Sequence, residues 1–253
     1  LAADIAFSPN DPNTVYVGGF DGGLYRSQDG GINWKEIGLP NRMPKVRIRN
    51  VEVHPTQKPD YVYVGTAAKH LSSLWRSKDG GNSWLWTGAG NLDMDGETYA
   101  IALDPTNPER LYFGLSDKCN SKGKRIDGVY YSDDGAVNNL TRLTYGSGSG
   151  SGCQETYRPN IVVKRDAVTG AVTERMSDGG GLTGALAINP HNKLHVLAGT
   201  YFVPGGYHAW KSGSKALLSS LDGGKTWEAY ADGLSYNGST EMVREIKFHP
   251  QIA

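Results

Sequence analysis

An eight-residue pattern that recurs along the chain constrains its fold more than any other feature of the sequence. The pattern reads Ser-x-Asp-x-Gly-x-x-Trp, and its good copies are SQDGGINW (27–34), SKDGGNSW (77–84) and SLDGGKTW (220–227). A fourth copy, SDDGAVNN (132–139), has Ala136 in place of the glycine and Asn139 in place of the tryptophan. Recurrence of one pattern at intervals indicates a repeated structural unit, so we expect a repeat fold.

The residue types of the pattern are those of a tight corner between two β-strands. The aspartate can accept hydrogen bonds from backbone N–H groups of its own turn, and the glycines permit a positive φ where the chain reverses. The tryptophan then opens the next strand and supplies a large apolar side chain to bury between sheets. Because local hydrogen bonds can use all the polar groups of such a corner, we predict a structural role for its residues. They are Ser27, Asp29, Trp34, Ser77, Asp79, Trp84, Ser132, Asp134, Ser220, Asp222 and Trp227.

Each corner lies within a longer unit that can be divided into four strands. In the first unit these are DIAFSP (4–9), TVYVGG (14–19), GLYRS (23–27) and WKEIG (34–38), and three further stretches repeat the arrangement. Alternation of apolar and polar residues supports the strands, and Pro, Asn, Asp and Gly mark the turns. Four antiparallel strands repeated about every 50 residues are typical of a β-propeller blade. We therefore predict an all-β propeller of four-stranded blades, about four to five of them, with boundaries near 1–49, 50–99, 100–145 and 185–242.

Two stretches depart from the regular repeat. Residues 146–184 begin with GSGSGSG, which has the composition of a flexible linker, and continue as a hairpin with its turn near Thr169 and Gly170. This hairpin is either the outer half of a partial blade or an insertion on the third blade. Residues 243–253, VREIKFHPQIA, repeat the opening of a blade, which predicts the first strand of a further blade. We expect the chain to be part of a larger propeller.

Composition favours short strands and excludes several classes of protein. The chain has 34 Gly, 14 Tyr and 6 Trp, and its 26 basic residues balance 26 acidic ones. A balanced charge gives no support for a nucleic-acid partner, and no apolar run is long enough to insert into a membrane. Cys119 and Cys153 could form one disulfide or remain thiols. No metal-binding spacing and no cofactor motif is present, so we expect neither.

The corner pattern resembles the Asp-box, or BNR repeat, of sialidases, sortilin-type receptors and xyloglucanase-like glycoside hydrolases. The resemblance covers nearly all of the chain except about 145–180. It implies a β-propeller and an exported protein, so we expect an extracellular or periplasmic location. The sialidase class also uses a cluster of three arginines and a tyrosine nucleophile, which have no counterpart that we can place in this sequence.

In the predicted blades, function is expected on the face opposite the corners, because loops without a structural task usually carry binding residues. This face holds the strand two–three loops, such as GFDGG (19–23), and the blade connections LPNRMPKVRIRN (39–50) and GAGNLDMDGETY (88–99). Aromatic side chains in the fourth blade's loop suit stacking on sugar rings or gripping a peptide. The candidate ligand-binding residues are Tyr201, Tyr207, His208, Trp210, Asp93 and Asp95.

Asp21 is the candidate catalytic residue, and this role comes from the resemblance. It lies in FDGGLYR, which is similar to the first-blade segment of the xyloglucanase-like family, where an aspartate facing the central cleft is a catalytic carboxylate. The segment here lacks one residue after Asp21. Glycoside hydrolysis ordinarily needs a second carboxylate across the cleft. Our first hypothesis is a propeller that binds a polysaccharide or protein ligand; the alternatives are a hydrolase of β-linked glucans and a structural or assembly subunit.

Overall fold

The structure is a computed structural model of the 253-residue chain. It describes residues 1–38, 46–67, 74–87, 97–115, 126, 128–143, 160–165, 168–169, 171–178, 182–201, 217–230, 235–236, 239–240, 243 and 245–249. Within these residues the regular secondary structure consists of strands, and no helix has the length and hydropathy that a membrane span needs.

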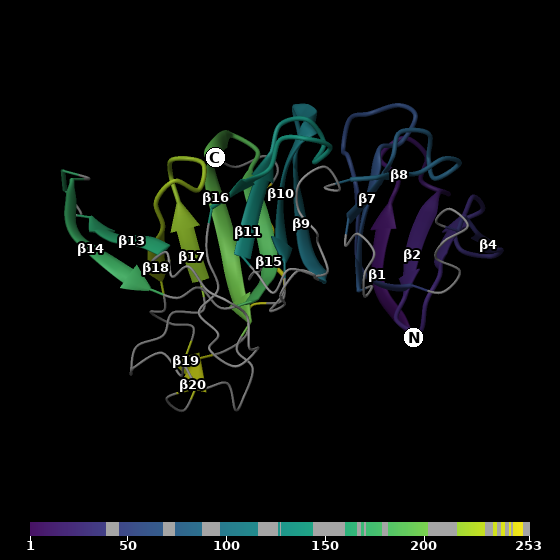
Figure 1. The fold of residues 1–253 in the computed structure, drawn as a ribbon. Helices are drawn as coiled ribbons and strands as arrows, with labels where there is room; N and C mark the ends of the chain where they lie inside the picture. The colour runs from purple at the N-terminus through teal and green to yellow at the C-terminus, as the bar shows by residue number, and fades with distance from the viewer. Residues whose placement is uncertain are drawn as a thin grey trace.

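Four four-stranded antiparallel sheets follow one another in chain order (Figure 1). Blade one contains β1 (Ala2–Phe7), β2 (Val15–Gly19), β3 (Leu24–Ser27) and β4 (Lys35–Glu36). Blade two contains β5 (Arg47–Val53), β6 (Val62–Ala67), β7 (Leu74–Ser77) and β8 (Leu85–Trp86). Blade three contains β9 (Thr98–Asp104), β10 (Asn107–Leu115), β11 (Gly128–Ser132) and β12 (Thr141–Arg142). Blade four contains β15 (Leu182–Asn189), β16 (Asn192–Tyr201), β17 (Leu217–Ser220) and β18 (Glu228–Tyr230).

Two hairpins lie outside these blades. The strands β13 (Asn160–Arg165) and β14 (Val172–Asp178) pair with each other, and β13 contacts β18, the outer strand of blade four. Figure 1 shows this hairpin at the end of the row of sheets, beside blade four. The short strands β19 (Ser235–Tyr236) and β20 (Ser239–Thr240) form the other hairpin.

The predicted all-β fold of four-stranded antiparallel blades is confirmed, and each blade uses its strands in sequence order. The observed first strands begin before the predicted ones; β5, for example, starts at Arg47 and not at Asn50. Ile48 explains the difference, because its side chain is buried between blades one and two and extends the pairing of β5. A pattern search that looks for the longest alternating run misses such isolated apolar positions.

Among the residues that the structure describes, the core consists of three apolar layers, each between two neighbouring blades. The layer between blades one and two includes Tyr16, Leu24 and Val51, and the layer between blades two and three includes Leu74 and Phe113. Blades three and four enclose a layer that contains, among others, Tyr112, Leu186, Leu218 and Trp227. Burial of these side chains is the main force that holds one sheet against the next.

We call the first strand of each blade its inner strand. Glycines on the second strand of one blade let the inner strand of the following blade approach closely. A Cβ atom at Gly18 would lie 2.3 Å from Ile48, one at Gly65 would lie 2.8 Å from the Thr98 carbonyl oxygen, and one at Gly199 would lie 2.7 Å from Val243. Each of these three contact residues stands seven residues before a proline in the sequence: Ile48 before Pro55, Thr98 before Pro105 and Val243 before Pro250. Val243 therefore occupies, against blade four, the place that an inner strand occupies in the preceding blades. Residues 245–249 have no strand assignment, so a fifth inner strand stays a prediction.

The Ser-x-Asp corners join the third and fourth strands of every blade. In blade two the Ser77 hydroxyl donates to Asp79 Oδ1 at 2.7 Å and accepts from the Gly81 N–H at 2.8 Å, while the Ser83 N–H donates to Asp79 at 2.8 Å. The corner of blade three keeps this arrangement although Ala136 has a φ of 62°. The corner tryptophans differ. Trp227 is buried, but Trp34 is 44% exposed, so the predicted burial between sheets is wrong for Trp34.

Candidate ligand-binding site on the loop face

The topology separates two faces of the row of blades. All four corners lie at the edge where the third strand ends, and the turn between the first and second strands shares this edge, as the Gly30 N–H bond to the Asn13 carbonyl shows. We call this edge the corner face. The opposite edge, which we call the loop face, holds the start of each inner strand and the end of each second strand.

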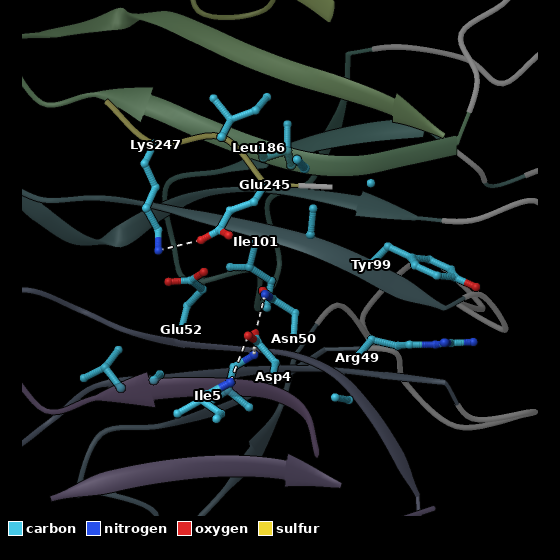
Figure 2. Close-up of a pocket in the computed structure, with 18 of the residues that line it drawn as sticks. Asp4, Ile5, Arg49, Asn50, Glu52, Tyr99, Ile101, Leu186, Glu245 and Lys247 are labelled. Carbon is cyan, nitrogen blue, oxygen red and sulfur yellow. Dashed lines mark hydrogen bonds and ion pairs between the residues drawn. The ribbon is translucent and has the colours of Figure 1, made fainter. Parts of the chain in front are cut away.

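A cavity of about 660 Å³ lies where the inner strands of the four blades meet. It is lined by β1, by Arg49–Val53 of β5, by Tyr99–Ile101 of β9, by Gly184–Leu186 of β15 and by Glu245–Lys247. Figure 2 shows carboxylates and Lys247 gathered toward one side of the cavity, with Arg49 and Tyr99 side by side at the other. The cavity therefore has an acidic part and an aromatic, basic part.

Asp4 and Glu52 form the half-buried portion of the acidic part. Burial raises the pKa of Glu52 to about 7, and the negative charge of Asp4 adds to this rise. The pKa of Asp4 is also raised by burial, although its carboxylate accepts hydrogen bonds from the Val51 N–H at 2.8 Å and from the Asn50 amide at 2.7 Å. Lys247 forms an exposed ion pair with Glu245 at 2.5 Å. At neutral pH Glu52 is thus close to its titration midpoint and can hold or release a proton.

Two arginines and two aromatic rings form a cluster at the loop-face end of the cavity. The guanidinium carbon of Arg49 lies 4.7 Å from the centre of the Tyr99 ring and 5.6 Å from that of Phe20. Arg49 also forms an ion pair with Glu97, at 2.6 Å, in which both side chains are 17% exposed. Arg47 covers the Phe20 ring at 4.2 Å. We call these five residues, Phe20, Arg47, Arg49, Glu97 and Tyr99, the Arg–aromatic cluster.

The backbone explains why these side chains meet. Phe20 follows β2, Arg47 and Arg49 open β5, and Tyr99 is near the start of β9, so all of them project from neighbouring strand ends on one face. In β5 Arg47 is exposed and Arg49 is half-buried, while Ile48 between them is buried, and the pairing register of β5 shifts between Ile48 and Asn50, at Arg49. Arg47 is fixed further by a hydrogen bond of 3.1 Å from its Nε to the Phe20 carbonyl oxygen. Arg47 is an exposed residue, so its guanidinium is held in place at the surface of the protein.

The structure places Asp21 at the exposed tip of the turn between β2 and β3, on the loop face. Its carboxylate is 79% exposed and lies 3.4 Å from the backbone nitrogen of Leu1. Asp21 is not among the residues that line the cavity. Its catalytic role therefore stays a prediction.

The other predicted binding residues are described only in part. Tyr201 is the last residue of β16, where its backbone pairs with Leu182. Tyr207, His208, Trp210, Asp93 and Asp95 lie outside the described residues, as do Cys119 and Cys153. Among the residues that are described, no group of three or more acidic, histidine or cysteine side chains could hold a metal ion.

Sequence reasoning selected the segments of the Arg–aromatic cluster but not its members. The three segments 19–23, 39–50 and 88–99 contain all five residues. The residues predicted from the sequence are instead Asp21, Asp93 and Asp95 in these segments and the aromatic residues of the fourth blade's loop. The alternation Arg-Ile-Arg at 47–49 was the available signal. It indicates a strand with one buried residue and two cations on the opposite side.

Known proteins resemble this chain in sequence over part of its length and in fold over most of it. No protein-family model matches. Vacuolar protein sorting/targeting protein 10 of Neosartorya fischeri is 28% identical over 128 residues, which are 49% of this chain and 8% of that protein, and the Aspergillus fumigatus protein of the same name is 26% identical over the same length. The GH74 xyloglucanase from Xanthomonas campestris superimposes with a TM-score of 0.56 at 19% identity, over 88% of this chain and 29% of that one. An ancestral GH74 enzyme gives a TM-score of 0.55 at 20% identity, over 91% and 24%.

These findings support the class of protein that the resemblance implied. The chain is a β-propeller that is similar in sequence to the Vps10 proteins over about half its length and similar in fold to the GH74 enzymes. It spans less than a tenth of the Vps10 proteins and less than a third of the two GH74 chains.

Proposed function

We propose that this propeller is a binding protein that holds a polysaccharide or protein ligand on its loop face, with the Arg–aromatic cluster as the anchoring point. The observation that supports this most strongly is the preorganised Arg47. Its Nε–H donates a hydrogen bond to the Phe20 carbonyl oxygen and its guanidinium lies over the Phe20 ring, yet the residue is exposed. An arginine that is already immobilised loses little conformational entropy when it binds a ligand, which favours affinity.

The neighbouring side chains suit the same role. Tyr99 and Phe20 offer ring surface for contact with a sugar or an apolar side chain, and aromatic and arginine residues are those that dominate binding energy in interfaces. Glu97 and Arg49 can exchange hydrogen bonds with hydroxyl groups at the rim of the cavity. We further propose that the protein acts outside the cytoplasm; the sequence similarity to a vacuolar sorting protein supports export.

Two substitutions test the binding site. Arg47→Ala and Tyr99→Ala are each expected to weaken binding at least tenfold, because each removes a stacked, partly desolvated contact. The measurement is isothermal titration or surface plasmon resonance of the whole protein with immobilised xyloglucan, mixed-linkage glucan and a peptide array. Arg142→Ala is the matched control, since Arg142 lies on the outer strand β12, over the Tyr130 ring. A ligand whose affinity is unchanged by both substitutions would contradict the proposal.

A second proposal is that the propeller hydrolyses β-linked glucans. The observation that favours it is Glu52, whose pKa of about 7 suits a general acid, together with Asp4 in the same cavity. Asp21 remains the carboxylate that the resemblance suggests. Incubation of the protein with the same glucans should release reducing ends. Loss of the release in Glu52→Gln would assign the chemistry to the cavity, and loss in Asp21→Asn would assign it to the exposed turn between β2 and β3. Absence of reducing ends with all of the glucans would count against this activity.

A further inference from the structure

Blade one exposes, on the side away from blade two, side chains whose counterparts in the other blades are buried. Ile5 stands four residues before Pro9. The residues at the same distance before Pro55, Pro105 and Pro190 in the following blades are Val51, Ile101 and Leu186. Ile5 is 53% exposed, whereas Val51, Ile101 and Leu186 are 2%, 3% and 7% exposed. The counterparts are buried because each packs against the preceding blade. Ile5 therefore marks a surface shaped to be covered in the same way.

Two more residues extend this surface. Phe7, two residues further along β1, is 67% exposed, while at the same place Val53 and Leu103 are partly buried and Ile188 is buried. Trp34 is 44% exposed, whereas Trp84 is partly buried and Trp227 is buried in the layer that also contains Leu143 of blade three. Trp84 donates its ring N–H to the carbonyl of Ile37 in blade one at 3.2 Å. We call Ile5, Phe7 and Trp34 the open face of blade one.

The polar contacts between neighbouring blades indicate which side chains a sheet packed on the open face of blade one would carry. Arg26 of blade one donates to the carbonyl oxygen of Gly80 in the corner of blade two, and the hydroxyl of Tyr16, which donates to Asp60, lies 3.4 Å from the same oxygen. Tyr112 of blade three donates to the Gly223 carbonyl in the corner of blade four, at 3.3 Å. Gly30 is the counterpart of Gly80 and Gly223 in blade one. No donor from another blade reaches its carbonyl in the part of the chain that the structure describes.

We propose that the open face of blade one is the docking surface for a further four-stranded blade of the same ring, one that resembles blade one itself. Its third strand would carry an arginine that donates to the Gly30 carbonyl as Arg26 donates to that of Gly80. Its second strand would carry a tyrosine whose hydroxyl reaches the same carbonyl as Tyr112 reaches that of Gly223. Its outer strand would carry an apolar residue against Trp34, as Ile37 lies against Trp84.

Blade four of this chain does not meet these requirements. Leu197 and Ser219 stand at the positions of Tyr16 and Arg26, so blade four lacks both donors. Its own outward side is already approached by Val243 at Gly199 and by Phe248, whose ring lies 5.0 Å from that of His195. If blade four packed directly on blade one, within one chain or between two copies, it would therefore offer neither a tyrosine nor an arginine to the Gly30 carbonyl oxygen.

An added blade tests the proposal. A copy of residues 1–49 carrying Trp34→Phe is joined in front of the full chain, so that the original Trp34 alone reports on the open face. Acrylamide quenching of Trp34, taken as the difference from the matching chain that lacks this tryptophan, should fall severalfold relative to the 253-residue protein. Tyr16→Phe and Arg26→Ala placed in the added copy alone should restore much of the quenching, and a copy of residues 182–230 should protect Trp34 less. Unchanged quenching with the blade-one copy, or protection that ignores the two donors, would overturn the proposal.

A second measurement needs no added blade. Ile5→Asn and Val51→Asn change equivalent positions of the unmodified chain, one on the open face and one in the layer between blades. The proposal requires the urea midpoint to shift markedly for Val51→Asn and hardly at all for Ile5→Asn. An equal shift would mean that Ile5 is already covered and would overturn it. Light scattering that detects a dimer abolished by Phe7→Asp would instead assign the open face to a second copy, and would also overturn it.

Discussion

The hydroxyl of Tyr16 in blade one donates a hydrogen bond to Asp60 Oδ2 in blade two, at a distance of 2.9 Å. Both residues are buried, and Asp60 also accepts from the Ser8 hydroxyl at 2.9 Å and from the Asn10 amide at 2.7 Å. One carboxylate thus collects three donors from the preceding blade. The neighbouring blades are joined by a buried, charge-assisted network as well as by their apolar layer.

Tyr16→Phe should therefore destabilise the protein by about 2 kcal/mol, because it removes a donor to a buried charge. Tyr63→Phe is the matched control: Tyr63 stands at the same position of blade two but donates to the neutral carbonyl of Pro108, at 2.8 Å. Its loss should cost about 1 kcal/mol. Urea unfolding followed by tryptophan fluorescence measures both, and equal losses would show that the charge of Asp60 adds nothing.

The corner glycines allow the packing between blades to be measured apart from backbone strain. Gly31 and Gly81 occupy the same turn position with φ of 93° and 88°. A Cβ at Gly81 would lie 2.6 Å from Ile37 Cδ1 in blade one, whereas a Cβ at Gly31 would meet only the ring of Trp34, at 3.5 Å. Both alanine variants bear the cost of a positive φ, about 1 kcal/mol. Gly81→Ala should lose at least about 1 kcal/mol more than Gly31→Ala, since it also disturbs a packed layer.

Ser77→Ala should destabilise blade two through its corner. The Ser77 side chain is buried, and its loss leaves the Gly81 N–H without the acceptor that it has at 2.8 Å. An unsatisfied buried donor costs about 1–3 kcal/mol. Ser83→Ala removes an exposed hydroxyl that donates to the same carboxylate, Asp79, and should cost well under that. Thermal unfolding of the two variants distinguishes the buried contact from the exposed one.

Glu52 should make the stability of the propeller fall as the pH rises through neutrality. Its pKa is raised from 4.5 to about 7 by burial first and by the charge of Asp4 second, while Lys247 opposes the rise and Glu245 supports it. Between these two pH values the folded protein keeps a proton that the unfolded chain has released, so the contribution of Glu52 to stability is highest below about pH 4.5 and is lost as the pH rises through about 7. Glu52→Gln should then be more stable than the natural chain at pH 8, by up to about 3 kcal/mol, with no gain at pH 4.5.

Chemical denaturation at pH 4.5, 6 and 8 measures this dependence. Glu36→Gln serves as the control, because Glu36 is exposed on the outer strand β4. A pH profile that is the same for the natural chain and Glu52→Gln would show that the Glu52 carboxyl does not bind the proton.

The fold was predictable from sequence because its information is local and repeated. The corner Ser77-Lys-Asp-Gly-Gly carries its own hydrogen-bond donors and acceptors, so it specifies a turn wherever it occurs. The alternation in Val62-Tyr-Val-Gly likewise specifies a strand whose glycine meets the next blade. Even the corner with Ala136 forms, since the serine and aspartate supply most of its hydrogen bonds.

The candidate site was less predictable because it is assembled from strand ends that lie far apart in sequence. Nothing local to Arg47 indicates that Phe20 lies beneath it, or that Tyr99 stands beside Arg49. The exposure of Trp34 was missed for a related reason. Its corner is identical in pattern to that of Trp227, but the ring of Trp227 is buried in a layer with residues of blade three, and the local pattern does not specify such a contact.

The glycines at 18, 65 and 199 also have a consequence for the geometry of the whole ring. Near the axis, the missing side chain lets two backbones approach closely, whereas farther out the rings of Tyr16 and Trp84 keep neighbouring sheets apart. Each pair of blades is therefore a wedge whose angle depends on the difference between these inner and outer volumes. The sizes of the side chains near the axis and far from it thus help to determine how many blades complete a ring. A residue larger than glycine at the inner position would widen the spacing of two blades near the axis before it weakened the pairing within either sheet.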